Sequence, residues 1–297
     1  MSDQSASSSS TSNFLLSGQS LVQEGDTAII YVNFGTAHAI SVTRGLTLAM
    51  KYGALRHEFL IGKPYGSRIS ATAGYVTVLR PSPELWTLTL PHRTQILYTP
   101  DIALITTLLD LKPGSAVAES GTGSGSLSHA LLRTIAPTGR LYTFDIDEKR
   151  VAAAKTEFER HGFAENVLIE QRNVCEAGFG LEDCVDSVFL DLPTPWQAVP
   201  TAKQALKRRA VGRLVAFSPC IEQVQRTCEA LTECGFVCVE TVELVPRRYK
   251  VSEIVFEPLI SPPDNQGHEK RLTFAPFPCL QPTHTGYLTG ASLLPRF

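Results

Sequence analysis

From Thr99 onward, strand-like and helix-like segments alternate along the chain, and this alternation constrains the fold more than any other feature. Short apolar runs are separated by amphipathic segments of roughly 10–15 residues. Thr99-Pro100-Asp101 is a typical helix start, with a capping hydroxyl, a proline at the first helical position and an acid in the first turn. Strands that alternate with helices predict an α/β fold, a doubly wound and mostly parallel Rossmann-like sheet.

The individual elements follow from the same periodicity. We expect helices at 99–111, 126–135, 148–161, 196–207 and 220–234, and strands at 115–119, 140–145, 166–171, 185–190, 213–217 and 236–243. Residues 284–288 are expected to return as a last edge strand.

Five segments make up the expected domain organisation. Residues 1–20 are Ser-rich and are expected to be a disordered tail, with neither signal peptide nor transit peptide. Residues 21–80, with strands expected at 27–32 and 75–79 between glycine turns, form a small β domain. A connector (81–98) leads to the α/β domain (99–257 plus 284–297), and the Pro-rich stretch 258–283 is expected to be a mobile insertion.

Composition and charge exclude some classes of protein. The 297 residues are 43% hydrophobic and 19% charged, which excludes a chain disordered throughout, and no apolar run is long enough to cross a membrane. The net charge of −2 does not indicate nucleic-acid binding, although residues 21–100 hold seven basic and four acidic side chains. That imbalance suits an anionic ligand or ordinary solvated surface. Seven cysteines without a CxxC pair predict reduced thiols and no metal site.

A glycine-rich loop lies between the first expected α/β strand and the next helix. Gly121, Gly123 and Gly125 alternate with Thr122, Ser124 and Ser126, which permits a tight turn beside a ligand. The spacing departs from the GxGxxG of dinucleotide folds. Glu119, just before the loop, would repel a pyrophosphate but could bind an ammonium group, and Asp145 ends the second strand, where a carboxylate holds a ribose. Together these features favour S-adenosylmethionine over NAD.

Further polar residues follow the third, fourth and fifth strands. Asn173-Val174 could meet the adenine edge of the cofactor, or Asn173 could serve a turn. Asp191, followed by two prolines and Trp196, could stabilise positive charge on a base nitrogen that receives a methyl group, or could cap a helix. Arg93 could contact phosphate, or simply bound the connector, and Ser218-Pro219 could line the pocket. No Ser/His/Asp order, metal-ligand spacing or Walker loop competes.

Several longer motifs resemble the catalytic subunits of eukaryotic tRNA (adenine-58-N1)-methyltransferases. The motifs are EGDTAI (24–29), LIGKPYGS (60–67), PELWTLTLPHRTQILY (83–98), ESGTGSGS (119–126), FLDLP (189–193), FSPCIEQVQRTC (217–228) and HTGYLT (284–289). The resemblance covers about 21–255 and the last motif. It implies a class I methyltransferase fold and methyl transfer from S-adenosylmethionine to N1 of an adenosine in the T-loop of tRNA.

The resemblance also implies roles for single residues. Asp191 would be catalytic and would also contact the cofactor. The other cofactor contacts would be Gln95, Leu97, Tyr98, Glu119, Gly121, Thr122, Gly123, Ser124, Gly125, Ser126, Asp145, Arg150, Asn173 and Val174. RNA contacts would be Lys51, Tyr52, Gly53, Arg56, His57, Arg93, Gln95, Ser218, Pro219 and Gln223. The family usually has Asp at the position of Asn173.

The resemblance finally implies a partner and a location. The partner would be a related non-catalytic RNA-binding subunit in a two-plus-two heterotetramer, and the complex would lie in the nucleus. A chain of net charge −2 needs basic surface from elsewhere to hold tRNA, so the isolated chain is expected to bind cofactor but to show little activity. The alternatives are a methyltransferase acting on protein or a small molecule, a non-catalytic RNA-binding scaffold and a nicotinamide oxidoreductase.

Overall fold

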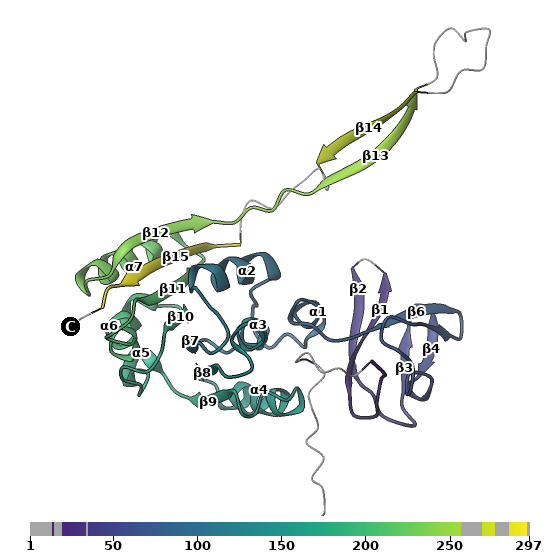
Figure 1. Cartoon of the computed structure of the whole chain (residues 1–297), viewed down its shortest axis with the longest axis horizontal. Coiled ribbons are helices and arrows are strands. Elements are labelled where there is room, and N and C mark those ends of the chain that lie inside the picture. The colour runs from purple at the N-terminus through teal and green to yellow at the C-terminus, as the bar shows by residue number, and fades with distance from the viewer. Residues whose placement is uncertain (1–13, 15–19, 34, 257–268, 277–284, 296–297) are drawn as a thin grey trace, which may run out of the picture.

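The computed structural model describes residues 14, 20–33, 35–256, 269–276 and 285–295 (Figure 1). A seven-stranded sheet forms the centre of the larger part, in the order β12-β15-β11-β10-β7-β8-β9. Its strands are β7 (Ala116–Ser120), β8 (Arg140–Asp145), β9 (Val167–Gln171), β10 (Ser187–Asp191), β11 (Gly212–Ser218), β12 (Val237–Glu243) and β15 (Tyr287–Leu293). Strands β7 to β11 are parallel, so the predicted doubly wound α/β fold is confirmed.

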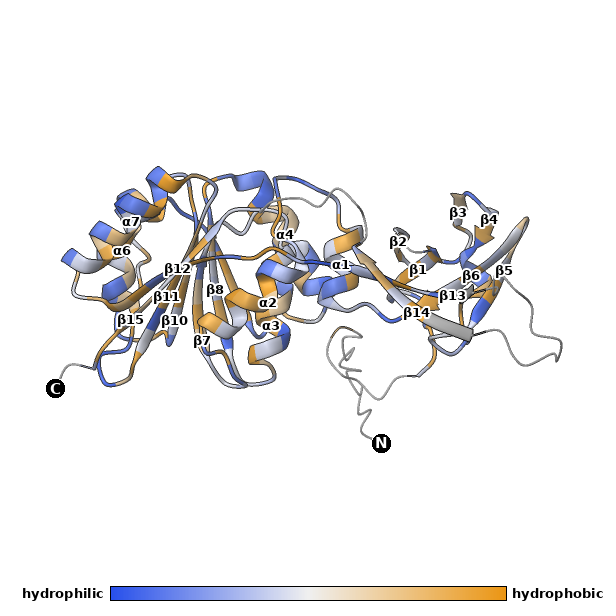
Figure 2. Ribbon diagram, turned by 90° about the horizontal axis from the view of Figure 1, so that it is seen from above, coloured by the Kyte–Doolittle hydropathy of each residue, from blue (hydrophilic) through white to orange (hydrophobic). Residues whose placement is uncertain are grey.

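Helices cover both faces of this sheet, because the side chains of each buried strand alternate between two cores. The helices are α2 (Thr99–Leu108), α3 (Ser126–Ile135), α4 (Glu148–Arg160), α5 (Val174–Ala177), α6 (Pro195–Ala205) and α7 (Ile221–Glu233). On β10, Phe189 packs with residues of α2, α3 and α4, whereas Val188 and Leu190 pack with α6 and α7. The central strands are correspondingly apolar in Figure 2.

The order of strands places a ligand site between β7 and β10. From β7 the chain proceeds to β8 and β9 on one side and then returns to β10 and β11 on the other. Open parallel sheets bind ligands at such a switch point, outside the carboxyl ends of the strands. The glycine loop follows β7, and Asp191 is the last residue of β10.

A smaller β unit precedes the connector. Strands β1 (Thr27–Asn33), β2 (Thr36–Ser41), β5 (Arg68–Ala71) and β6 (Gly74–Leu79) form an antiparallel sheet, and β3 (Thr47–Met50) pairs with β4 (Gly53–Arg56). The two strands predicted here, 27–32 and 75–79, are confirmed. The connector contains a short helix, α1 (Pro83–Thr89). Ser82 caps the start of this helix, because the Ser82 hydroxyl accepts a hydrogen bond from the Leu85 N–H.

The structure differs from the predictions near both ends of the chain. The last strand is not an edge strand: β15 lies between β11 and β12 and pairs antiparallel with both. Phe14, within the predicted disordered tail, is buried, and its ring centroid lies 4.2 Å from that of His161. The other residues of the tail up to 19 lie outside the described residues.

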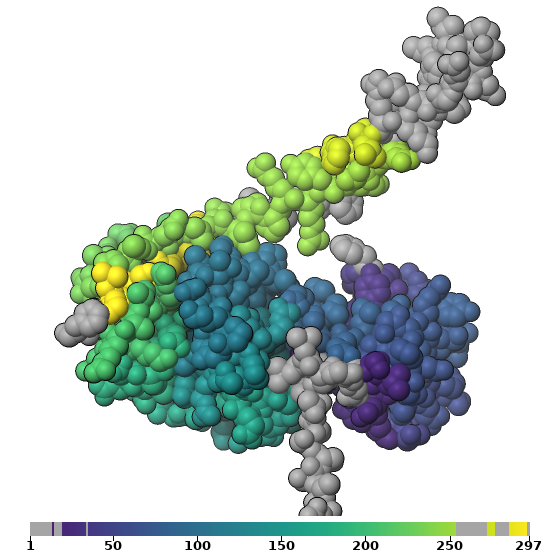
Figure 3. Space-filling model, viewed as in Figure 1, coloured from purple at the N-terminus to yellow at the C-terminus, as the bar shows by residue number. Residues whose placement is uncertain are grey.

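A hairpin that the sequence patterns did not predict projects from the body of the molecule. It consists of β13 (Tyr249–Phe256) and β14 (Glu269–Pro276), which pair antiparallel over eight residues each. Figure 3 shows the hairpin standing clear of the larger part and of the β unit. Within the predicted mobile insertion, 258–283, only β14 belongs to the described residues.

Candidate functional site

Three cavities meet at Asp191, at the carboxyl ends of β7, β8 and β10. The first, of about 450 Å³, extends over the ends of β8 and β9 to α5 and α6. The second, of about 570 Å³, lies between the connector, the start of α2 and the end of β11. The third, of about 30 Å³, separates the glycine loop from Thr94–Leu97. Asp191 lines all three, so its carboxyl group can face two ligands at once.

Asp191 is the side chain best placed for chemistry. Burial raises its pKa from the usual 3.8 to about 6, so the carboxyl group is ionised at neutral pH but destabilised by its surroundings. Among the residues that the structure describes, no donor or cation contacts this carboxylate. Asp191 is half-buried. A desolvated carboxylate without a partner is costly for the fold, and such groups occur where a ligand supplies the missing hydrogen bonds.

The glycine loop fits closely beneath Asp191. Gly121 has a φ of +100°, and a Cβ at this position would lie 2.4 Å from the backbone oxygen of Asp191. The absence of a side chain at Gly121 therefore lets the loop pack directly against the end of β10, in addition to leaving room for a ligand. The N–H groups of Gly121 and Thr122 donate to Phe144 and that of Gly123 to Asp145, so these amides hold the loop in place.

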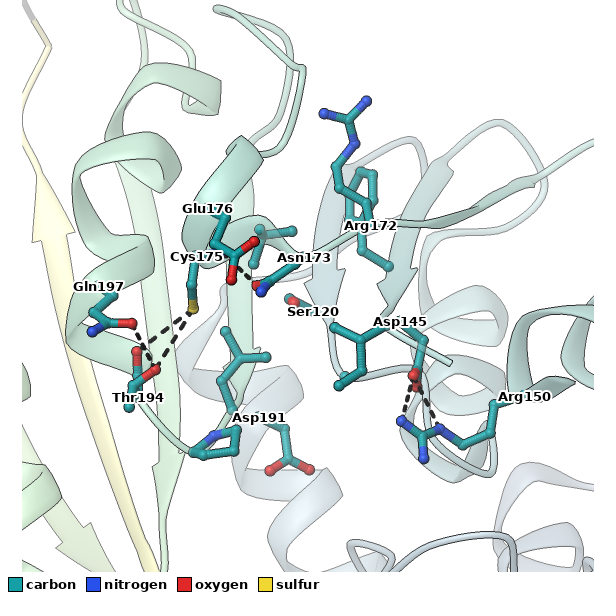
Figure 4. A pocket seen from close by; sticks show the side chains of 16 residues that line it. Ser120, Asp145, Arg150, Arg172, Asn173, Cys175, Glu176, Asp191, Thr194 and Gln197 are labelled. Atoms are coloured by element: carbon teal, nitrogen blue, oxygen red, sulfur yellow. Dashed lines mark hydrogen bonds and ion pairs between the residues drawn. The ribbon is translucent and has the colours of Figure 1, made fainter. Parts of the chain in front are cut away.

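Asp145 and Arg150 both line the first cavity. The Asp145 carboxylate accepts hydrogen bonds from the Arg150 guanidinium, at 2.6 and 3.0 Å (Figure 4). It also accepts one from the N–H of Gly123 at 2.9 Å. This carboxylate raises the pKa of Arg150. Asp145 is thus fixed at the end of β8, and it keeps acceptor capacity for a hydroxyl of a bound ribose.

The structure does not bring Glu119 to the cavities, contrary to the predicted ammonium contact. Its carboxyl group is buried and accepts hydrogen bonds from Ser128 at 2.6 Å and Thr143 at 2.7 Å. Burial is the main reason that its pKa rises to about 7, and Asp191 and Asp145 raise it further. The side chain points into the interior because β7 alternates, so Glu119 joins β7 to β8 and α3.

Asn173 and Val174 lie in the first cavity, where the sequence placed them. Asn173 also serves the turn that was the alternative: its Oδ1 accepts from the Cys175 N–H at 3.1 Å and caps α5. Val174 is buried in the core with an edge on the cavity. An apolar wall beside an amide is suited to an adenine ring.

Among the predicted connector residues, Gln95 and Leu97 border the second and third cavities and Tyr98 the second. The Leu97 carbonyl accepts a hydrogen bond from Ser126 at 2.9 Å, which fastens the connector to the start of α3. Ser124 fixes the same stretch by accepting from the N–H groups of Arg93 and Thr94. At about 30 Å³, the third cavity is too small to hold a ligand group of the size of an amino acid unless this part of the connector moves.

Two predicted RNA contacts are engaged within the fold. Arg93 donates to both carboxylate oxygens of Glu157, at 2.7 and 3.0 Å, and to the Ser124 carbonyl, so its guanidinium is already paired with an acid of the same chain. His57 is buried, its Nδ1 accepts from the Thr43 N–H, and burial lowers its pKa. Basic character alone did not reveal that these two side chains are engaged in this way, and their RNA contacts stay predictions.

The remaining predicted RNA contacts form two separate groups. The β3–β4 turn of the β unit holds Lys51, Tyr52 and Gly53, and Arg56 is the last residue of β4. The side chains of Lys51 and Arg56 are exposed. Pro219 and Gln223 border the second cavity, whereas Ser218 is buried with no partner for its hydroxyl among the described residues. Gln223 donates to the Pro193 carbonyl at 2.9 Å and so holds the lip after Asp191.

The second cavity contains residues that sequence reasoning did not assign to a site. Asp101 was read only as part of a helix start, and Thr285 only within the last motif. Their signal was position: Asp101 is in the first turn of α2, and Thr285 precedes β15, which pairs with β11 at this end of the sheet.

Within the described part of the chain, no group of three or more His, Cys, Asp or Glu side chains is arranged to hold a metal. Over the same residues, no helix is long and apolar enough to span a membrane.

Comparison with known proteins shows which family the chain is similar to. Residues 74–272 match the family model described as "tRNA methyltransferase complex GCD14 subunit". A relative from Cryptococcus neoformans, named tRNA (adenine(58)-N(1))-methyltransferase catalytic subunit, is 46% identical over 82% of this chain and 55% of its own length. The chain therefore spans only about half of that relative.

A more distant relative and a solved structure match over greater lengths. The Dictyostelium discoideum protein of the same name is 36% identical over 95% of this chain and 100% of its own length. The structure of a SAM-dependent O-methyltransferase from Thermotoga maritima has a TM-score of 0.77 and 27% identity, and covers 94% of this chain and 98% of that one.

Proposed function

The chain belongs to the family of tRNA methyltransferase complex GCD14 subunits, and on this premise we propose that it is the catalytic subunit of a tRNA (adenine-58-N1)-methyltransferase. The observation that carries the proposal is the position of Asp191, where one carboxylate without a partner among the described residues borders both large cavities. In this assignment the first cavity takes S-adenosylmethionine and the second takes the target adenine. The names of the two relatives support this choice over O-methylation.

The residues of the first cavity fit the cofactor. Asp145 supplies a carboxylate for the ribose hydroxyls, and Val174 with Leu192 supplies apolar surface for the adenine ring. Arg150 already pairs with Asp145, so it orients that carboxylate. Bound here, S-adenosylmethionine supplies an electrophilic methyl group, whose transfer places a positive charge on the purine ring of the substrate.

Asp191 contributes orientation and charge. Its carboxylate accepts a hydrogen bond from the exocyclic amine of the target adenine, which directs the lone pair of N1 toward the methyl group. The same negative charge stabilises the positive charge that develops on the ring. Because the pKa of Asp191 is about 6, the rate of methyl transfer should fall as the pH decreases below 6 and the carboxylate becomes protonated.

The proposed partner is a related RNA-binding subunit, in a complex of two copies of each. Two observations support a partner: the net charge of −2 is poorly suited to tRNA, and the β13–β14 hairpin has an exposed apolar face. Tyr249, Val251, Leu272 and Phe274 are 56%, 53%, 62% and 67% exposed, and the strand register puts all four on one face. As the resemblance implies, we place this complex in the nucleus.

The substrate assignment is tested by methylating unmodified tRNA with the chain alone and with its partner subunit, and mapping the product by nucleoside mass spectrometry. We expect 1-methyladenosine only with the partner, and none in a tRNA whose adenosine 58 is replaced by uridine. Methylation of free nucleosides or peptides, with tRNA left unmodified, would instead favour a different methyltransferase. Native mass spectrometry of the complex checks the two-plus-two stoichiometry.

A further inference from the structure

A hydrogen bond between Thr285 and Asp101 lies at the wall of the second cavity. The Thr285 hydroxyl is 2.9 and 3.0 Å from the two carboxylate oxygens of Asp101, and both residues line the cavity with Asp191. Thr285 is exposed, whereas Asp101 is 3% exposed and lies behind it. The bond joins residues 184 positions apart, from the first turn of α2 and the segment before β15.

The surrounding fold fixes the position of Thr285. Gly286 follows it, and a Cβ on Gly286 would lie 2.5 Å from the Phe217 ring, so that ring packs directly on this backbone. Tyr287 then pairs with Ser218 at the end of β11. Thr285 is therefore held from one side by Asp101 and from the other by β11, at the same end of the sheet as Asp191.

The number of protons available determines what this pair can recognise. A threonine hydroxyl has one hydrogen and two lone pairs, and here the hydrogen is directed at the Asp101 carboxylate. The Thr285 oxygen consequently offers acceptors to the cavity. Asp191 is also an acceptor when ionised. A ligand with two N–H groups on one nitrogen matches such a pair, whereas a carbonyl in the same place would meet only acceptors.

We propose that Thr285 accepts a hydrogen bond from the exocyclic amine of the target adenine, and that Asp101 is a positioning residue that orients the Thr285 hydroxyl for this contact. This inference rests on the proposed function. One amine hydrogen goes to Asp191 and the other to Thr285. The pair thereby selects adenine against 6-oxopurines, since a site built for a donor leaves its acceptors unpaired when the donor is missing.

The test is a cycle that combines a protein substitution with removal of the substrate amine. The complex with its partner methylates tRNA carrying either adenosine or purine riboside, which lacks the amine, at position 58. We define the amine penalty as kcat/KM for the adenosine tRNA divided by kcat/KM for the purine riboside tRNA. If the purine riboside tRNA reacts too slowly to measure, its inhibition constant against methylation of the adenosine tRNA is used in place of its kcat/KM. Wild type is compared with Thr285→Val, Thr285→Ser and Asp101→Asn. Thr289→Val is the matched control, because Thr289 is on β15 but pairs with Thr241.

We expect Thr285→Val to shrink the amine penalty about tenfold, the value of one hydrogen bond, and Asp101→Asn to shrink it by a smaller factor. Thr285→Ser, which retains the hydroxyl, and Thr289→Val should keep the wild-type penalty. An unchanged penalty in Thr285→Val, or an equal reduction in Thr285→Ser, would overturn the inference while the proposed function stands. Absence of methylation by the wild-type complex would remove both. Binding of S-adenosylhomocysteine shows that each variant is folded.

Discussion

Two carboxyl groups near the glycine loop, the half-buried Asp191 and the buried Glu119, have raised pKa values but different surroundings. Asp191 faces the cavities without a partner among the described residues, whereas Glu119 is satisfied by Ser128 and Thr143 in the interior. The two motifs that predicted them, ESGTGSGS for Glu119 and FLDLP for Asp191, did not reveal this difference. Asp191, the last residue of β10, faces the cavities, whereas Glu119, the second-last residue of β7, points beneath the loop.

Glu119 should make stability depend on pH. Its pKa is about 7 in the folded protein and 4.5 as a model value, so the folded state binds the proton more tightly. Stability is then lost as the pH rises from 4.5 through 7. Glu119→Gln lacks this loss, and we expect its free energy of unfolding to exceed that of wild type by up to about 3 kcal/mol at pH 8, with little difference at pH 5.

Urea unfolding at pH 5 and pH 8 measures this effect. Glu165→Gln is the matched control, because Glu165 is exposed and should show no such difference. If Glu119→Gln is destabilised equally at both pH values, the carboxyl group is ionised throughout and burial does not control it.

At the scale of elements, the Arg93–Glu157 ion pair holds the connector against α4 and the glycine loop. The two side chains are 17% and 13% exposed. Arg93→Ala leaves Glu157 without its cation, and we expect a loss of about 2–3 kcal/mol of unfolding free energy together with weaker cofactor binding. Arg56→Ala, at an exposed site on β4, should leave stability within about 0.5 kcal/mol of wild type.

The salt dependence of tRNA binding distinguishes a side chain that only holds the fold together, as expected of Arg93, from one that contacts a phosphate, as expected of Arg56. Loss of a phosphate contact lowers the salt slope by about one. We expect this for Arg56→Ala in the complex and not for Arg93→Ala. The reverse pattern, with Arg93→Ala stable and its salt slope reduced, would support the predicted RNA contact of Arg93.

The β13–β14 hairpin is the element at which we expect the proposed partner to bind. An isolated two-stranded hairpin is marginal in water, and one face of this one is apolar. Phe274→Asp should abolish co-purification with the partner subunit and leave the melting temperature of the chain alone unchanged. Ala275→Asp, on the opposite face of β14, is the control and should retain the complex. An intact complex in Phe274→Asp would place the partner elsewhere.

For the molecule as a whole, local patterns predicted the alternation of elements and the end of the sheet where the site lies. The helix start at Thr99 and the loop before Ser126 are local signals, and both helices begin there. Strand order is not local: apolar periodicity cannot show that β15 inserts between β11 and β12. For the same reason Thr285 was missed, since its partner Asp101 is 184 residues away.

The central claim is that Asp191 serves methyl transfer rather than folding or cofactor binding. Its most direct test is single-turnover methyl transfer to tRNA by the Asp191→Asn complex, with cofactor affinity measured on the same preparation. We predict cofactor binding within a few-fold of wild type and transfer slower by at least about 100-fold, with the wild-type rate falling below pH 6. Transfer at the wild-type rate by Asp191→Asn would contradict the account.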